Sequence, residues 1–423
     1  MIPTRPIFVA LLLVASAAVP VGTVAATPQQ SEGYAGTHVE FETTADALVD
    51  YSVDGETVLE SVTVQSQSEA ESQGDMSADV GLSAVTELSG TGLSLASQMT
   101  VNATVNAESG ATMEAHDNSQ GILLVRSGDD SQYVTVNVSS SSSAESEDGQ
   151  RVSVTTDDGT EGTFIVVGDG EVTVNEQGNV SADLKSDSTL VFRAYPEGRD
   201  DDDQQEERSI SDGRAAAEVH VMAAGEQGSE LAADVVRYSE DTAVEVSQKS
   251  EGTVRMTAER SQEEGRIIIT SVSEQAISSA EDLQVMVDGE AAAEASAYSE
   301  LESAIGGNAS RYMVRQQSSA EASADVLVAV NSFSQREITM TGGSDGNDGS
   351  DGNDGSDGND GSNGNDGSDG NDGSDGSASG DDGDGDGDSD QQTSTSGDGS
   401  GFGLVAVILA LSALTGVLAH RRR

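Results

Sequence analysis

Apolar and polar residues alternate with period two along much of residues 27–342. Alternation places successive side chains on opposite faces of an extended chain, so it predicts half-buried β-strands. The pattern is clearest in four segments, namely 57–64 (from Glu60 onward), 132–138, 170–174 and 252–258. Three other segments are apolar at consecutive positions and are predicted to be central strands buried on both faces. They are 121–125, 164–167 and 266–269.

Asp-Gly pairs separate several of these segments. They occur within 53–56, 157–159, 168–170 and 287–290. This dipeptide favours tight hairpin turns that need positive φ. Strands that recur with turns every 8–15 residues indicate a mainly β, antiparallel, multi-stranded domain over residues 27–342, built as an elongated sandwich or as stacked β layers.

Three segments depart from the strand pattern. Two short helices are predicted at 273–280 and 298–305, the second ending at Gly306-Gly307, which suits a helix C-terminus. The acidic run 200–207 is predicted to be a solvated loop. It lies within 198–213, which we interpret as the boundary if the domain is divided into two β lobes.

The first 26 residues have the layout of a secretory signal peptide. Arg5 precedes an apolar segment at 7–19, and small residues end at Ala26. We expect a signal peptidase to cleave after Ala26. The alternative is an N-terminal membrane helix, for which the apolar segment is too short.

Residues 343–400 are dominated by Gly, Ser, Asp and Asn, with repeats of Gly-Ser-Asp-Gly-Asn-Asp. Such a segment lacks the apolar surface needed to fold, so we predict a disordered acidic stalk. Asp382, Asp384 and Asp386 resemble the start of a calcium loop. Position twelve is Thr393 instead of glutamate, which favours loose association of counter-ions over a formed calcium site.

The C-terminal segment 401–423 combines a Gly401-Phe402 pair, an apolar run at 403–419 and a basic end. This layout resembles the PGF-CTERM sorting signal of archaeal surface proteins, with Ser400 where that family has proline. The resemblance implies cleavage by an archaeosortase and attachment of a lipid. The alternative is a permanent transmembrane helix, oriented by the basic residues Arg421, Arg422 and Arg423.

Composition extends this picture. The chain has 19 Lys+Arg against 76 Asp+Glu, a net charge of −57, and lysine only at 185 and 249. Such acid-rich, lysine-poor composition resembles that of haloarchaeal proteins. It argues against a nucleic-acid partner, because no basic face is available for phosphates. The chain has no cysteine, which excludes disulfides, thiolate metal sites and thiol nucleophiles.

Candidate chemistry is sparse. Four Asn-x-Ser/Thr triplets are candidate N-glycosylation sites, at Asn102, Asn137, Asn179 and Asn308. We expect at least one of them to be used, and Asn308, in a loop after two glycines, is expected to be the most exposed. His38, His116 and His220 lack the spacing of a metal motif. We therefore predict no catalytic residues, no cofactor and no metal.

These features together predict a non-enzymatic protein on the outer side of the plasma membrane. We expect it to be anchored through its C-terminal helix or a lipid, to associate with surface-layer components, and to have a structural or adhesive role. One alternative is a surface module that binds a glycan or a divalent cation. Another is a surface hydrolase that uses Asp or Glu.

Overall fold

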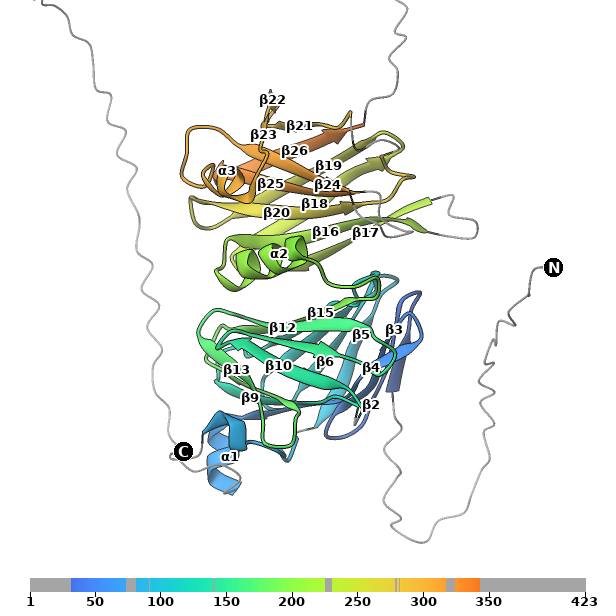
Figure 1. Ribbon diagram of the computed structural model, residues 1–423, viewed down its shortest axis with the longest axis vertical. Coiled ribbons are helices and arrows are strands. Elements are labelled where there is room, and N and C mark those ends of the chain that lie inside the picture. Colours follow the sequence, from blue (N-terminus) through green and yellow to red (C-terminus); the bar gives the residue numbers. More distant parts are fainter. Residues whose placement is uncertain are drawn as a thin grey trace, which may run out of the picture. The chain divides into compact units, whose positions relative to one another are not determined.

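The computed structural model describes residues 32–73, 81–90, 92–139, 141–224, 230–277, 280, 282–316 and 324–342. These residues form four β-sheets, mostly antiparallel, so the predicted mainly β fold is confirmed (Figure 1). The predicted signal peptide 1–26, the stalk 343–400 and the sorting signal 401–423 lie outside the described residues.

Sheets A and B come from the first half of the described chain. Sheet A has the order β1-β2-β3-β4-β9-β14-β13, and sheet B has the order β10-β11-β12-β15-β8-β7-β6-β5. The strands of sheet A are β1 (Glu32–Ala35), β2 (Val39–Thr43), β3 (Leu48–Val53), β4 (Glu56–Ser66), β9 (Gln132–Asn137), β13 (Gly170–Val174) and β14 (Val180–Leu184). Those of sheet B are β5 (Leu93–Gln98), β6 (Asn102–Ala107), β7 (Thr112–His116), β8 (Leu123–Arg126), β10 (Ser143–Asp148), β11 (Arg151–Thr155), β12 (Glu161–Val167) and β15 (Thr189–Tyr195).

Sheets C and D come from the second half. Sheet C has the order β17-β16-β20-β25-β24-β23, and sheet D has the order β18-β19-β26-β21-β22. Two neighbouring pairs in sheet C, β16–β20 and β23–β24, are parallel. The strands of sheet C are β16 (Ala215–Ala224), β17 (Glu230–Arg237), β20 (Glu264–Val272), β23 (Ala293–Glu294), β24 (Arg311–Gln316) and β25 (Ala324–Ser332). Those of sheet D are β18 (Thr242–Ser250), β19 (Thr253–Arg260), β21 (Gln284–Val287), β22 (Glu290–Ala291) and β26 (Gln335–Thr341).

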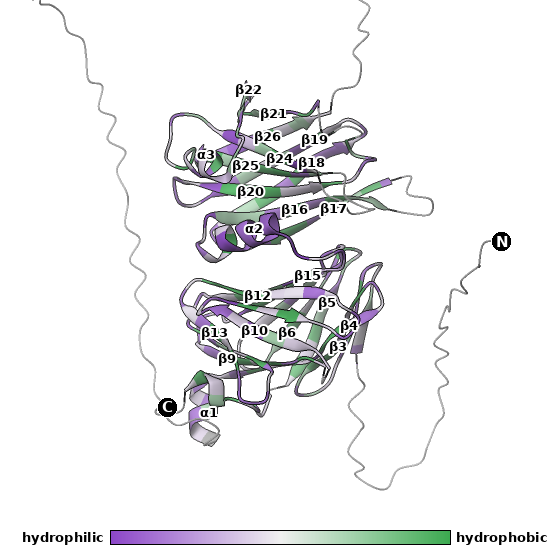
Figure 2. Ribbon diagram, viewed as in Figure 1, coloured by the Kyte–Doolittle hydropathy of each residue, from purple (hydrophilic) through white to green (hydrophobic). Residues whose placement is uncertain are grey.

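Helices are short and few in the described segments. They are α1 (Gln67–Gln73), the 3-10 turn η1 (Leu82–Ala84), α2 (Asp201–Ser211) and α3 (Tyr298–Glu302). Along the chain α2 lies between β15, the last strand of sheets A and B, and β16, the first strand of sheets C and D. Figure 2 shows α2 as largely hydrophilic, in contrast to the apolar strands on either side of it.

Three apolar cores lie between the four sheets. One joins sheets A and B, a second joins sheets C and D, and a third joins sheets B and C. Alternation along single strands explains how two cores share one sheet. On β15, Leu190 and Phe192 face sheet A, whereas Val191 faces sheet C. Sheets B and C are therefore inner layers, buried on both faces.

The sequence predicted these strands well. The four alternating segments correspond to β4, β9, β13 and β19, and the three apolar segments to β8, β12 and β20 in the inner sheets. The turns at Asp54-Gly55 and Asp288-Gly289 have positive φ at both residues, as the tight hairpin requires. The second predicted helix corresponds to α3, which is shorter than expected and is followed by Gly306 at φ 71°.

Two predictions were wrong. Residues 273–277 form a single turn, in which the amides of Ala276 and Ile277 donate to the carbonyl of Ser273, and not the start of a helix. Ala276 and Ile277 are buried in the core between sheets C and D, so tertiary packing decides the conformation. The acidic run 200–207, predicted to be a solvated loop, contributes most of α2, with Glu206 and Glu207 buried.

Candidate functional site

Charged side chains lie buried between sheets B and C. Arg193 on β15 has a fully buried side chain. Its Nη2 lies 3.1 Å from Glu218 Oε1 on β16 and 3.3 Å from Glu206 Oε2 on α2, and it donates to Gln120 Oε1 at 2.9 Å. Tyr238 donates its hydroxyl hydrogen bond to Glu218 Oε2. Three consecutive elements, β15, α2 and β16, thus meet at one guanidinium group.

The alternation of side chains along β16 explains why its charged residue faces the space between sheets B and C. On β16, Ala217, Val219 and Val221 pack into the core between sheets C and D. Glu218 and His220 occupy the alternate positions and therefore project toward sheet B. Buried charges are tolerated only when they are paired and hydrogen-bonded, which is the arrangement that Arg193 provides.

Burial and pairing shift the pKa values of the two glutamates in opposite directions. Burial alone would raise the pKa of Glu218, but the Arg193 charge and hydrogen bonds from Tyr238 and His220 lower it to about 2. Burial and the nearby Asp325 carboxylate raise the pKa of Glu206 to about 8, although Arg193 and Arg315 oppose this shift. Glu218 is therefore ionised at neutral pH, whereas Glu206 retains much of its proton.

Two histidines flank a buried aspartate beside this group. His116 Nδ1 on β7 and Asp234 Oδ1 on β17 are 2.9 Å apart, and Asn118 Nδ2 donates to Asp234 Oδ2 at 2.9 Å. His220 is the direct cross-strand partner of Asp234. Burial would raise the pKa of Asp234, but His116, His220 and Asn118 lower it. Sheet B thus contacts sheet C through a second group of buried polar side chains.

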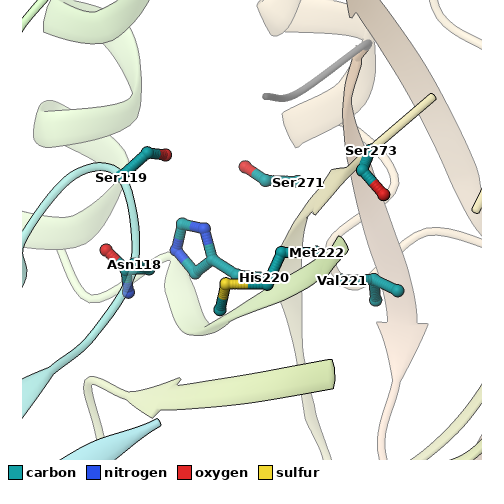
Figure 3. Close-up of a pocket in the computed structure, with 7 residues that line it drawn as sticks. All are labelled: Asn118, Ser119, His220, Val221, Met222, Ser271 and Ser273. Carbon is teal, nitrogen blue, oxygen red and sulfur yellow. The ribbon is translucent and has the colours of Figure 1, made fainter. Parts of the chain in front are cut away.

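A small, partly open cavity adjoins His220. Figure 3 shows His220 between Asn118 and Ser119 on one side and Ser271 and Ser273 on the other. The cavity has a volume of about 20 Å³, enough for roughly one water molecule. Ser271 donates its hydroxyl hydrogen bond to Asp325 Oδ1, so its proton is not directed at His220. Ser271 and His220 therefore do not form a nucleophile pair.

Further arginines surround helix α2. Arg315 Nη1 on β24 donates to Glu206 Oε1 at 2.5 Å, and its Nε lies 3.1 Å from Asp202 Oδ2. Arg199 Nη2 donates to Glu207 Oε2 at 2.5 Å, and the Tyr195 hydroxyl donates to Glu207 Oε1 at 2.9 Å. The acidic residues of α2 thus contact Arg315 of sheet C and Arg199 of the segment that precedes the helix.

We call the group Arg193, Glu206, Glu218, His116, Asp234 and His220 the interlayer cluster. Its ion pairs and hydrogen bonds can fix the position of sheet B relative to sheet C. Within the described ranges, no group of three or more His, Asp or Glu side chains is arranged to bind a metal ion.

Sequence reasoning did not find this cluster. It treated the histidines separately, whereas the structure brings His116 and His220 to the same aspartate. His38, just before β2, instead lies 2.9 Å from Asp54 in the turn between β3 and β4. A usable signal was present, because Glu218 and His220 interrupt an otherwise apolar strand at alternate positions, where polar residues are costly unless paired.

The four predicted glycosylation sites differ in exposure. Asn308 is exposed in an irregular segment after α3. Asn102 and Asn137 are half-buried within β6 and β9, and Asn137 donates to Ser61. Asn179 is half-buried next to β14, and Ser181 of the same triplet is fully buried. Ala26 and the predicted sorting residues Ser400, Gly401, Phe402, Arg421, Arg422 and Arg423 lie outside the described residues.

No protein-family model matches the chain, and no curated protein sequence is similar to it. Within the part of the chain that the structure describes, none of the helices is long and apolar enough to span a membrane.

Proposed function

We propose that this chain is a non-enzymatic surface protein of an archaeal envelope, with a structural or adhesive role. The observation that carries the proposal is the interlayer cluster. Its charged groups pair with one another and with neighbouring polar groups, and the adjoining cavity of about 20 Å³ is far smaller than a substrate pocket. The ionisable residues of the interlayer cluster, which could otherwise serve in catalysis, instead connect sheet B to sheet C.

The alternative is a hydrolase that uses Asp or Glu, and Glu206 is a candidate for it because a raised pKa is a property that catalytic acids share. Glu206 is 1% exposed and is held between Arg193 and Arg315. A catalytic acid must reach its substrate, and Glu206 is too buried to do so. We therefore assign Glu206 a role in stability.

We further propose export through the signal peptide 1–26 and anchoring through segment 401–423. Support comes from the sequence: an apolar run of marginal length, the Gly401-Phe402 pair and the three terminal arginines. In this proposal an archaeosortase-like enzyme cleaves near Ser400 and attaches a lipid, and the mature protein associates with the surface layer.

Mass spectrometry of the protein from native membranes tests the anchoring. We expect a C-terminal peptide that ends near Ser400 and carries a lipid. The double substitution Gly401→Ala and Phe402→Ala should leave an uncleaved form that still sediments with membranes through its helix. An intact wild-type peptide extending to Arg423 as the main species would instead establish a permanent transmembrane anchor.

Asn308 is the glycosylation site that we propose to be used. Its exposure and irregular backbone allow a transferase to approach, unlike the strand positions Asn102 and Asn137. We expect the same mass spectra to show a glycan on the Asn308 peptide, and Asn308→Gln to remove it. A glycan found only on Asn137 would contradict this assignment.

A further inference from the structure

The cavity beside His220 is bordered by two neighbouring strands and one loop. Asn118 and Ser119 come from the loop after β7, and His220 and Met222 come from β16 (Figure 3). β16 pairs in parallel with β20, and His220 lies directly opposite Ser271. The volume of about 20 Å³ accommodates a single water molecule or a single metal ion.

Strand β16 presents two soft metal ligands to this cavity. His220 and Met222 occupy alternate positions, and alternation along a strand places such residues on the same face. Figure 3 shows both side chains at the cavity. An imidazole nitrogen and a thioether sulfur are suitable ligands for copper, whereas carboxylate oxygens suit magnesium and calcium. Among the described residues, none that lines this cavity is a carboxylate.

The imidazole ring of His220 has a carboxylate beside it. His220 Nε2 lies 3.1 Å from Glu218 Oε1, and both side chains are buried. The carboxylate favours a proton on Nε2, which leaves the lone pair of the neutral ring on Nδ1. Histidines that bind metals almost always direct their second ring nitrogen at such a partner, because the partner fixes the tautomer and the ring orientation. Glu218 thus prepares Nδ1 of His220 to act as a ligand.

Access and burial also suit a bound ion. The cavity is partly open, so an ion can enter it from solvent. His220 is 4% exposed, and Met222 is half-buried. Much of the surface of both ligands is therefore shielded from water, and such shielding controls how far solvent competes for a metal.

From this arrangement we propose that the cavity beside His220 binds a soft monovalent metal ion of the copper(I) and silver(I) class. The protein ligands are His220 Nδ1 and Met222 Sδ, and the ion lies between β16 and the loop that contains Asn118 and Ser119. This inference goes beyond the proposed surface role and does not rest on it. A chain without an anchor or an adhesive role would still bind the ion, so the two sets of experiments fail independently.

The ligand set determines which ions the site selects. Zinc sites are tetrahedral, and magnesium and calcium need oxygen ligands. One imidazole and one thioether provide neither arrangement, whereas copper(I) accepts thioether ligands. The sequence prediction of no metal site rested on histidine spacing and on the absence of cysteine, and a single histidine beside a methionine gives neither signal.

Nuclear magnetic resonance of the whole secreted chain in molar potassium nitrate tests the proposal. Silver nitrate is the probe, and nitrate replaces chloride because chloride precipitates silver. We expect the methyl signal of Met222 and the ring nitrogen signals of His220 to shift in a saturable way as silver is added. Met99, which is 61% exposed, is the reference for non-specific binding to a thioether, and its signal should move only when silver is in excess.

Substitutions separate the proposed site from binding elsewhere on the surface. Met222→Leu removes the sulfur at nearly constant volume, and should weaken silver binding at least about tenfold. Met99→Leu is the matched control and should bind like the wild type. His220→Gln should abolish the saturable binding. If His220→Gln changes the circular dichroism spectrum, the wild-type signals of His220 and Met222 decide the question.

Several outcomes would overturn the inference. They are equal shifts of the Met99 and Met222 signals, unchanged silver affinity in Met222→Leu, or no shift of the His220 and Met222 signals. In the last case the cavity holds only water. Zinc chloride replaced by zinc nitrate serves as the comparison probe. If zinc shifts the His220 signals at a lower concentration than silver does, the site is not selective for soft ions and the proposal is wrong.

Discussion

Arg193 shows how a very acidic chain uses its few basic residues. It is fully buried, and only its Nη2 contacts the cluster carboxylates and Gln120. A buried ion pair gives little net stability compared with an apolar pair, but removing one partner leaves a charge without compensation. Arg193 therefore determines the register of sheets B and C more than it increases the stability of their contact.

We predict that Arg193→Leu lowers the free energy of unfolding by about 3–5 kcal/mol, because it leaves Glu218 charged and buried. The double variant Arg193→Leu and Glu218→Leu should recover much of this loss. Arg214→Ala is the control, since Arg214 pairs with Glu302 at the surface with 44% of its side chain exposed, and should cost at most about 1 kcal/mol. Urea unfolding measures all three, and equal losses for Arg193→Leu and Arg214→Ala would contradict the prediction.

The raised pKa of Glu206 makes the stability of the folded chain depend on pH. Its pKa is about 8 in the folded chain against an ordinary value of 4.5. Between these values the folded state binds more protons than the unfolded state, so the free energy of unfolding falls as pH rises. Burial raises the pKa of Asp203 to about 6. Asp203 therefore adds to the decrease in the free energy of unfolding below about pH 6. Glu218, with its lowered pKa, loses its contribution only below about pH 4.5.

We therefore expect thermal stability to decrease from pH 5 to pH 8. Glu206→Gln mimics the protonated side chain and should flatten the decrease, most clearly between pH 6 and pH 8. Glu302→Gln, which removes a carboxyl group near the surface, should keep the wild-type slope. Scanning calorimetry across this range is the measurement, and an unchanged slope in Glu206→Gln would show that another group is responsible.

At the scale of elements, helix α2 depends on one capping residue. Asp200 Oδ1 accepts from the amides of Asp202 and Asp203, and the Asp203 side chain accepts from the Asp200 amide. This reciprocal capping box satisfies amides that no helical carbonyl can reach. Carboxylates in the first turn also interact favourably with the helix dipole, which helps a run of four aspartates to begin a helix.

Asp200→Ala should lower the free energy of unfolding by about 1 kcal/mol through loss of the cap. Asp201→Ala is the matched control, because Asp201 is exposed in the first turn and accepts no capping bond. It should cost less than half as much. Chemical unfolding compares the two variants, and an equal loss in both would assign the effect to the dipole and not to the cap.

Elements with a repeating pattern could be predicted from sequence, and α2 could not. β4 and β20 follow directly from alternation and from a consecutive apolar run. The acidic run hides its amphipathic character, because the side chains that it buries, Glu206 and Glu207, are charged. Their burial depends on Arg193 of β15, on Arg199 just before the helix and on Arg315 of β24, which is more than 100 residues away. No pattern in the sequence identifies these three arginines as the partners.

The same reasoning explains why the order of strands in the sheets was not predicted. Residues 32–35 and 93–98 form ordinary short strands, and nothing in their sequence indicates that they become edge strands of two sheets. Edge status depends on the strand order of two sheets, which the chain sets through long-range pairs such as β4 with β9. Sequence patterns predict which face of a strand is buried, whereas the whole fold determines which strands are neighbours in a sheet.

At the scale of the whole molecule, repulsion opposes the apolar cores. The chain has a net charge of −57, and close carboxylates repel one another strongly when salt is dilute. In molar salt the screening length falls to about 3 Å, which removes most repulsion between exposed groups. Buried pairs such as Arg193 with Glu218 are screened far less, so salt should act on the surface and leave the interlayer cluster unchanged.

We therefore predict that dialysis from molar to millimolar potassium chloride removes most of the β-sheet signal in circular dichroism, and that returning the salt restores it. Sucrose at matched osmolarity should not replace the salt, because it screens no charge. Arg193→Leu should lose the same free energy of unfolding, relative to wild type, at two and at four molar salt, as a buried defect would. A wild-type spectrum that is unchanged in millimolar salt would mean that the four-layer cores overcome the repulsion unaided.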